Sequence, residues 1–272
     1  MTSALFPPIP ADTAKAARAV FGSSNFYVAI GDQANQLFHG LALPHPNKPS
    51  QKQEQVLAGL FLITIFQYLE SLPDSQAADA VRKRADWKYA LHLPLDVSGF
   101  QASKFCEFRK LLLVDQASAQ TLHTLLSRLP VVGSSNHAEY SSLEAGQIVL
   151  RVCLLSRLVS AWEAIGQALE ALAIKQPDWL RTISRPHWYE RYSHTHGSLN
   201  LRADSPELER LAQAIGSDGA YLLESVSGKA SLAELPEVTS LRQVWDEQYE
   251  RAEGEVLWRK NTCAECSVIF GF

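Results

Sequence analysis

Apolar side chains recur every three to four residues through most of the chain, which is the period of an amphipathic helix. No segment alternates apolar and polar residues over the length that a half-buried strand needs. The sequence therefore predicts an all-α protein. The expected helices cover approximately residues 12–21, 32–38, 53–71, 75–91, 101–113, 118–129, 145–175, 205–216, 218–226 and 237–252.

Two of these helices organise the N-terminal half. Residues 53–71 are apolar on most sides, which is typical of a helix buried by its neighbours,. The turn Leu72-Pro73-Asp74 separates them from the helix at 75–91, and two helices joined by three or four residues have the spacing of a helix-turn-helix motif,. The helix at 101–113 would complete a compact unit.

The second half is predicted to be built on one long helix, residues 145–175. Its apolar residues recur at a mean spacing close to 3.5, so one side is expected to pack against a partner along its whole length,. The stretch VVGSSNHAEYSS before it is typical of a linker,. The predicted organisation is an N-terminal helical domain (1–130), a linker (131–144), a second helical domain (145–258) and a frayed tail (259–272).

Charge is distributed unevenly along a chain whose formal net charge is −4. Residues 1–130 carry 12 Lys and Arg against 10 Asp and Glu, whereas the remainder carries 13 against 19. Only the N-terminal half is therefore expected to offer a surface to a polyanion. The candidate phosphate-binding residues are Arg82, Lys83, Arg84, Lys88, Lys104, Arg109 and Lys110.

The bland interpretation of this basic stretch is a solvated helix face whose charges pair locally. Asp79 could pair with Lys83, and Asp86 with Arg82. Composition alone favours that interpretation. In the alternative, the cations neutralise phosphates while Trp87 or Tyr89 stacks on or braces the nucleic acid.

Few other motifs indicate chemistry. Four residues have donor atoms that suit zinc, namely the pair His194 and His196 and the pair Cys263 and Cys266,. The two pairs are nearly seventy residues apart in the sequence, so a metal site is not expected. Three acids (Glu139, Glu144 and Glu163) have no spacing that singles them out for two-metal catalysis,. The free-thiol cysteines, the absence of a signal-peptide pattern and an apolar run too short to span a bilayer indicate a cytoplasmic protein without a membrane partner,.

The stretch FQYLESLPDSQAADAVRKRADWKYALHLPLDVSGFQASKFCEFRKLLL closely resembles the N-terminal helical (InsH-type) domain of bacterial DDE insertion-sequence transposases. The DWKYAL and EFR motifs are its most specific parts, and weaker matches such as WYERY and LAQAIGSDGAYLLESV extend it over residues 5–258. The resemblance implies that the N-terminal domain binds the terminal inverted repeats of an insertion sequence. It also raises the phosphate-binding interpretation above the bland one.

In the same family, a separate RNase H-like domain with three acids and two Mg²⁺ ions cuts DNA. Alignment on the long helix places Glu144, one methylene longer, where the family has its first catalytic Asp. The other two acids would lie beyond Phe272. The resemblance therefore implies a chain that binds no Mg²⁺ of its own and does not cleave DNA alone, unless another polypeptide supplies the missing acids.

A different hypothesis treats the chain as a non-catalytic helical interaction module. The apolar seam of residues 148–172 would then pair with a second copy of the chain or with a full-length transposase. Such a protein would regulate or inhibit transposition by forming mixed assemblies.

Overall fold

A computed structural model of the chain describes residues 4–44, 50–130, 144–193 and 206–259. These residues contain 13 helices and one two-stranded sheet, which confirms the all-α prediction. The chain divides into two compact units, Met1–Val152 and Cys153–Phe272. The division falls inside the long helix α9 (Ala145–Lys175) rather than in the expected linker. That linker, apart from Glu144, and the expected tail, apart from Arg259, lie outside the described residues.

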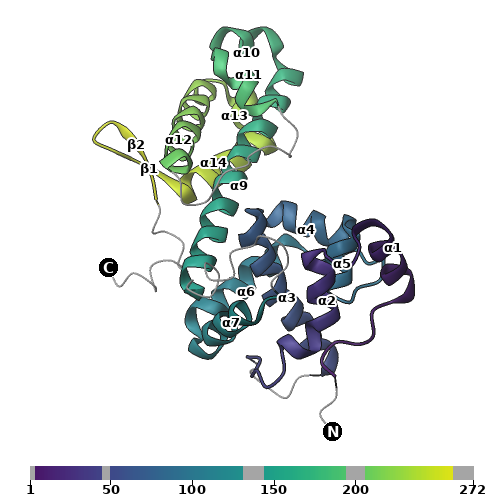
Figure 1. The fold of residues 1–272 in the computed structure, drawn as a ribbon. Helices are drawn as coiled ribbons and strands as arrows, with labels where there is room; N and C mark the ends of the chain where they lie inside the picture. Colours follow the sequence, from purple (N-terminus) through teal and green to yellow (C-terminus); the bar gives the residue numbers. More distant parts are fainter. Residues whose placement is uncertain (1–3, 45–49, 131–143, 194–205, 260–272) are drawn as a thin grey trace. The chain divides into compact units, whose positions relative to one another are not determined.

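The first unit is arranged around α3 (Figure 1). Its helices are α1 (Ala11–Phe21), α2 (Phe26–Leu37), α3 (Gln51–Glu70), α4 (Asp74–Lys83), α5 (Ala85–Ala90), α6 (Ala102–Val114) and α7 (Gln116–Arg128). Ser50 begins α3 with a capping box that it shares with Gln53,. Ten consecutive residues of α3, from Ala58 to Gln67, are buried, as expected for a helix that is apolar on most sides,.

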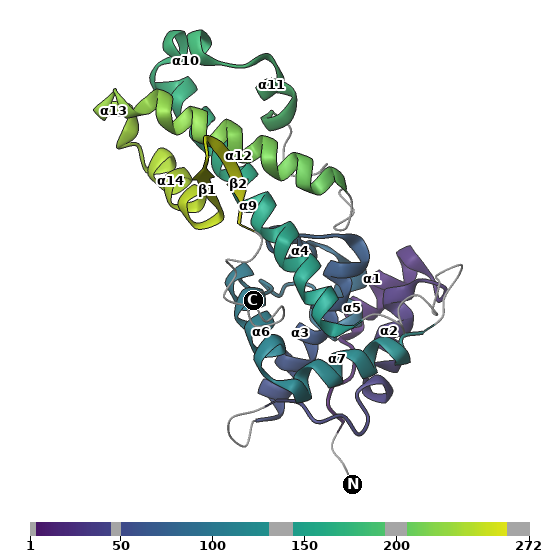
Figure 2. The same ribbon diagram turned by 90° about the vertical axis from the view of Figure 1, so that its left-hand side faces the viewer.

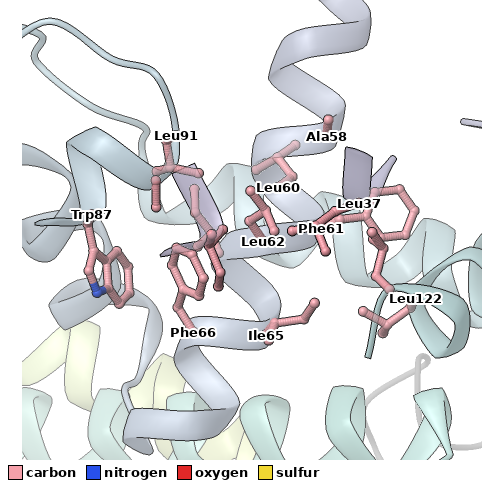
Figure 3. Close-up of a cluster of buried hydrophobic side chains, with 14 of the residues drawn as sticks. Leu37, Ala58, Leu60, Phe61, Leu62, Ile65, Phe66, Trp87, Leu91 and Leu122 are labelled. Carbon is pink, nitrogen blue, oxygen red and sulfur yellow. The ribbon is translucent and has the colours of Figure 1, made fainter. Parts of the chain in front are cut away.

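Aromatic side chains pack among the aliphatic ones in the core around α3, and Phe61, Phe66 and Trp87 are labelled in Figure 3. The rings of Phe66 on α3 and Trp87 on α5 lie 5.1 Å apart, and Phe61 meets Phe108 of α6 edge to face at 4.9 Å. Leu122 of α7 belongs to the same cluster. Because such pairs add to the free energy gained by burial, this cluster fixes α5 and α6 against the central helix.

Two elements in the first unit differ from the sequence prediction by more than a shift of one or two residues at their ends. Helix α2 begins at Phe26 rather than near Asp32, because the Asn25 side chain caps it by accepting the N–H groups of Tyr27 and Val28,. The predicted helix at 75–91 is interrupted at Arg84, whose backbone is extended (φ −92°, ψ 124°). The interruption separates α4 from α5.

The second unit packs around the later turns of α9 (Figure 2). It adds α10 (Pro177–Ile183), α11 (Pro186–Tyr192), α12 (Pro206–Ser227), α13 (Ala230–Ala233) and α14 (Pro236–Gln248). The strands β1 (Tyr249–Ala252) and β2 (Glu255–Trp258) form an antiparallel hairpin, with Tyr249 opposite Trp258.

Two predictions for this unit were wrong. Gly216 does not end a helix, because α12 continues through it to Ser227. Residues 249–252, predicted as the end of a helix, form strand β1 instead. The hairpin of β1 and β2 packs against α12 at Gly216. A Cβ at Gly216 would stand 2.5 Å from the Tyr249 ring and 3.0 Å from Val256, so the hairpin needs a residue without a side chain there,.

The apolar seam of α9 is filled by side chains of the chain itself. Ile148 and Val149 belong to the core of the first unit, while Leu155, Val159 and Ile165 belong to that of the second. The packing partner that the 3.5-residue spacing predicted is therefore supplied within each unit.

Among the residues that the structure describes, no single helix has the length and apolar character needed to cross a membrane.

Candidate functional site

Helices α3 and α4 form a sharply bent pair. Their axes are inclined by 112° across the connection at residues 71–73. This angle and this length lie within the helix-turn-helix range, which is roughly 90–120° across three or four residues. The sequence predicted the spacing, and the structure adds the angle.

Local hydrogen bonds hold the turn in one conformation. Ser71 adopts the left-handed region (φ 54°, ψ 48°) and ends α3, while the N–H of Leu72 donates to the carbonyl of Gln67 at 2.8 Å. The Gln67 side chain donates in turn to the Leu72 carbonyl at 3.3 Å and to the Asp74 carboxylate at 2.8 Å. The orientation of α4 is therefore set by buried polar contacts as well as by apolar packing.

Asp74 also fixes the start of α4 to α6. Both of its carboxylate oxygens accept hydrogen bonds from the Arg109 guanidinium, each at 2.7 Å. The Arg109 side chain is only 2% exposed. A bidentate pair of this kind defines both distance and direction, so α4 and α6 are fixed relative to each other.

Four of the seven predicted phosphate-binding side chains lie on the surface of the first unit. Arg82 and Lys83, in the last turn of α4, have side chains that are 54% and 64% exposed. Lys104 and Lys110 of α6 are exposed as well. We refer to Arg82, Lys83, Lys104 and Lys110 as the four exposed cations.

Two carboxylates partly balance these cations. Asp79 accepts hydrogen bonds from both Arg82 and Lys83, and Lys104 donates to Glu107 at 2.7 Å. The hydrogen bond from Lys83, reinforced by the charge of Arg82, lowers the pKa of the Asp79 carboxyl below its usual range. The local pairing of Asp79 with Lys83 that the bland interpretation expected is thus present, yet this single carboxylate is shared by two cations, Arg82 and Lys83.

The other three basic residues are engaged inside the fold. Lys88 is buried and donates its Nζ to the carbonyl of Leu95, and Arg109 is held by Asp74. As folded, neither has the surface exposure that a phosphate contact needs, which corrects their place in the predicted set. Asp86, expected to pair with Arg82, pairs instead with Arg84 at 2.7 Å.

Arg84 lies at the centre of a half-buried network at the α4–α5 break. Its guanidinium donates to Glu70 at 2.5 Å and lies 5.2 Å from the ring centres of both Tyr27 and Trp87. Burial by itself would lower the pKa of Arg84, but the hydrogen bonds to Asp86 and Glu70 outweigh it and leave the pKa raised. This arginine stabilises the break between the helices.

The two aromatic residues proposed to stack on nucleic acid are buried. The Trp87 indole donates to Glu70 at 3.2 Å, and the Tyr89 hydroxyl donates to Asp32 at 2.6 Å and accepts from Arg18. They brace α5 from within. The partners Glu70 and Asp32 were missed in the sequence because nothing in their spacing connects them with residues 84–89.

The acidic and metal candidates do not gather into a site in the described part of the chain. Glu144 is exposed just before α9, where its carbonyl accepts the N–H of Gln147 at 3.0 Å. No group of three or more His, Cys, Asp or Glu side chains that could hold a metal ion occurs among the described residues. Glu139, His194, His196, Cys263 and Cys266 lie outside them.

Comparisons with protein-family models, with curated proteins and with solved structures give no match to this chain. The resemblance to InsH-type transposases therefore stays a prediction, carried by the motifs in residues 66–113.

Proposed function

We propose that the first unit binds double-stranded DNA through α4 and the exposed cations beside it. The observation that carries the proposal is the 112° angle between α3 and α4, in a pair whose second helix ends in Arg82 and Lys83. A fixed second helix with cations on its exposed side is what insertion into a groove requires. Phosphates would be contacted mainly by the four exposed cations.

The resemblance to transposases suggests which DNA is bound and in which process. The DNA would be the terminal inverted repeats of an insertion sequence, and the chain would act in transposition as a DNA-binding component located in the cytoplasm. We propose no cleavage step for this chain by itself, and Mg²⁺ enters only as the ion that the resembled family uses. Phosphate contacts would fix the register, whereas sequence choice needs contacts to base edges.

The alternative, a helical module that pairs through the α9 seam, receives less support. Self-association through that seam would require apolar side chains that are free to meet a second chain. The seam residues are instead buried in the two cores. Binding to a full-length transposase would need a different surface.

The test is a titration of the whole chain against a fluorescently labelled random duplex of about 30 base pairs at several salt concentrations. If four phosphates are neutralised, log K should fall against log salt with a slope of roughly −3 to −4. Selection from a randomised duplex pool would then reveal a preferred sequence. Absence of binding at low salt, or binding that salt does not weaken, would overturn the proposal.

A further inference from the structure

The second unit contains a cavity of about 900 Å³ between α9 and the α10–α11 segment. Its size is at the upper end of the range found for small-molecule sites. Four aromatic side chains line it, namely those of Trp162, Trp188, Tyr189 and Tyr192. The DNA-binding proposal makes no use of this cavity.

Polar contacts anchor the aromatic wall from behind. The Trp162 indole donates to the carbonyl of Arg191 at 2.7 Å, which ties α9 to α11. The Tyr192 hydroxyl donates to the Asp218 carboxylate at 2.9 Å, and Arg191 forms an ion pair with the same carboxylate. Because the Asp218 side chain is only 2% exposed, α11 is held on α12 by a buried charge network,.

Two acids and one base belong to the lining of the cavity. Glu163 and Glu170 of α9 belong to its lining. One cation, Arg185, lines it too, but the Arg185 guanidinium lies 4.0 Å from the Tyr221 ring centre and 3.5 Å from Asp218. The charge of that arginine is therefore partly offset by an aromatic face and by Asp218, a carboxylate that it shares with Arg191. A ligand would meet the exposed carboxylate of Glu170 beside aromatic rings.

We propose that this cavity binds an organic cation, a substituted ammonium group with an apolar body. Aromatic faces attract cations through the quadrupole of the ring, and the attraction is strongest for Trp and substantial for Tyr. The exposed Glu170 would add attraction for the charge, while the rings would cover the methyl or methylene groups. A neutral ligand of the same shape would gain only the apolar contact.

The experiment compares two probes of nearly equal shape, choline and 3,3-dimethylbutan-1-ol, by isothermal titration calorimetry on the whole chain. Choline carries the positive charge and the alcohol does not. We expect choline to bind with a Kd on the order of 1 mM, and the alcohol to bind at least about tenfold more weakly. Equal affinities, or no choline binding at about 50 mM, would overturn the proposal.

Two variants locate the site. Glu170→Gln changes an exposed residue of the lining and should weaken choline binding several-fold without affecting the alcohol. Tyr189→Leu removes a ring that is 79% exposed, so the fold should tolerate it, and it should also weaken choline binding. Glu207→Gln, on the exposed side of α12 and outside the lining, is the matched control. Equal effects of Glu170→Gln and Glu207→Gln would contradict the assignment. DNA binding should be unchanged in all three variants, so the two proposals can fail separately.

Discussion

Asp74 and Arg109 are joined by two parallel hydrogen bonds of 2.7 Å, with the Arg109 side chain 2% exposed. The pair connects the first residue of α4 with the middle of α6, thirty-five positions later in the chain. Arg109, which the sequence analysis assigned to phosphate binding, therefore has a structural role. The orientation of the proposed DNA-binding helix depends on it.

Removing one partner of this pair should destabilise the first unit strongly. Arg109→Leu removes the guanidinium that holds both carboxylate oxygens of Asp74, and breaking a buried ion pair typically costs about 3–5 kcal/mol,. The loss can be measured by urea unfolding, with hydrogen exchange at the α3 and α6 amides to localise it. Lys110→Leu, the exposed neighbour on α6, should change the free energy of unfolding by less than about 0.5 kcal/mol. A cost below about 1 kcal/mol for Arg109→Leu would mean that the pair does not fix α4.

The salt dependence of DNA binding should separate surface cations from buried ones. The double substitution Arg82→Gln with Lys83→Gln should reduce the steepness of log K against log salt by roughly 2, since each lost phosphate contact removes about 0.9. Lys88→Met should leave the slope unchanged, because the Lys88 ammonium is turned to the Leu95 carbonyl. Fluorescence anisotropy at several salt concentrations measures both. The opposite ranking would place the contact surface elsewhere.

The sequence predicted the helices whose boundaries are decided locally. Helical periodicity located α6 and α9 almost to the residue, and it identified α3 as the buried centre. It could not show the break at Arg84, because the apolar stripe continues across it. The extended backbone there accompanies pairing with Glu70, fourteen residues earlier.

The candidate site shows the same limit. Arg82 and Arg84 are both basic residues in one short segment, and nothing in that segment distinguishes an exposed cation from one that packs against Tyr27 and Trp87. Gly216 likewise fits two explanations, a helix stop or a close contact. The choice depends on Tyr249, thirty-three positions later,. In each case the role of the residue depends on a partner that is distant in the sequence, and hydrophobic periodicity carries no information about such partners.

Asp79 should limit the affinity of the chain for DNA. It shares its carboxylate between Arg82 and Lys83, so Asp79→Asn removes a negative charge from the proposed contact surface. A unit charge about 4 Å away contributes on the order of 1 kcal/mol in water, so binding should strengthen several-fold at moderate salt. Asp178→Asn, which breaks the comparable exposed pair with Arg181 in the second unit, is the control and should have no effect. Weaker binding by Asp79→Asn would show that Asp79 orients the two cations rather than competing with DNA.

Gly216→Ala should destabilise the second unit by separating the hairpin from α12. The added Cβ would lie 2.5 Å from two carbon atoms of the Tyr249 ring, and overpacking of this kind costs typically about 1–3 kcal/mol,. At Gly228, just after α12, a Cβ would meet no heavy atom within 4 Å, so Gly228→Ala should be neutral or slightly stabilising,. Urea unfolding of the two variants gives the comparison. Tyr249→Leu in the Gly216→Ala background should recover part of the loss, and a Gly216→Ala variant as stable as Gly228→Ala would contradict the predicted clash.

The free energy of unfolding should fall at alkaline pH because burial raises the pKa of four tyrosines, two in each unit, among them Tyr27 and Tyr192. Burial, followed by the negative charge of Glu70, raises the pKa of Tyr27, and burial together with Asp218 raises the pKa of Tyr192. Unfolded tyrosine ionises near pH 10. Each residue therefore contributes its full stability below about pH 10 and loses it as the pH rises towards the folded-state pKa.

At pH 11 the loss should be about 1.4 kcal/mol for each of these tyrosines relative to pH 9. Urea unfolding between pH 9 and 11 measures it, and hydrogen exchange assigns the Tyr27 share to the first unit and the Tyr192 share to the second. Tyr27→Phe should remove the Tyr27 share of the pH dependence from the first unit only, and Tyr192→Phe the Tyr192 share from the second only, while Tyr89 and Tyr249, whose pKa burial also raises, keep theirs. Tyr189→Phe, at an exposed position, controls for the general effect of alkaline pH and should leave the slope unchanged. If Tyr27→Phe and Tyr189→Phe leave the same dependence of the unfolding free energy on pH, the Tyr27 hydroxyl ionises as readily in the folded protein as in the unfolded chain. The hydrogen bond to Glu70 would then not raise the pKa of Tyr27.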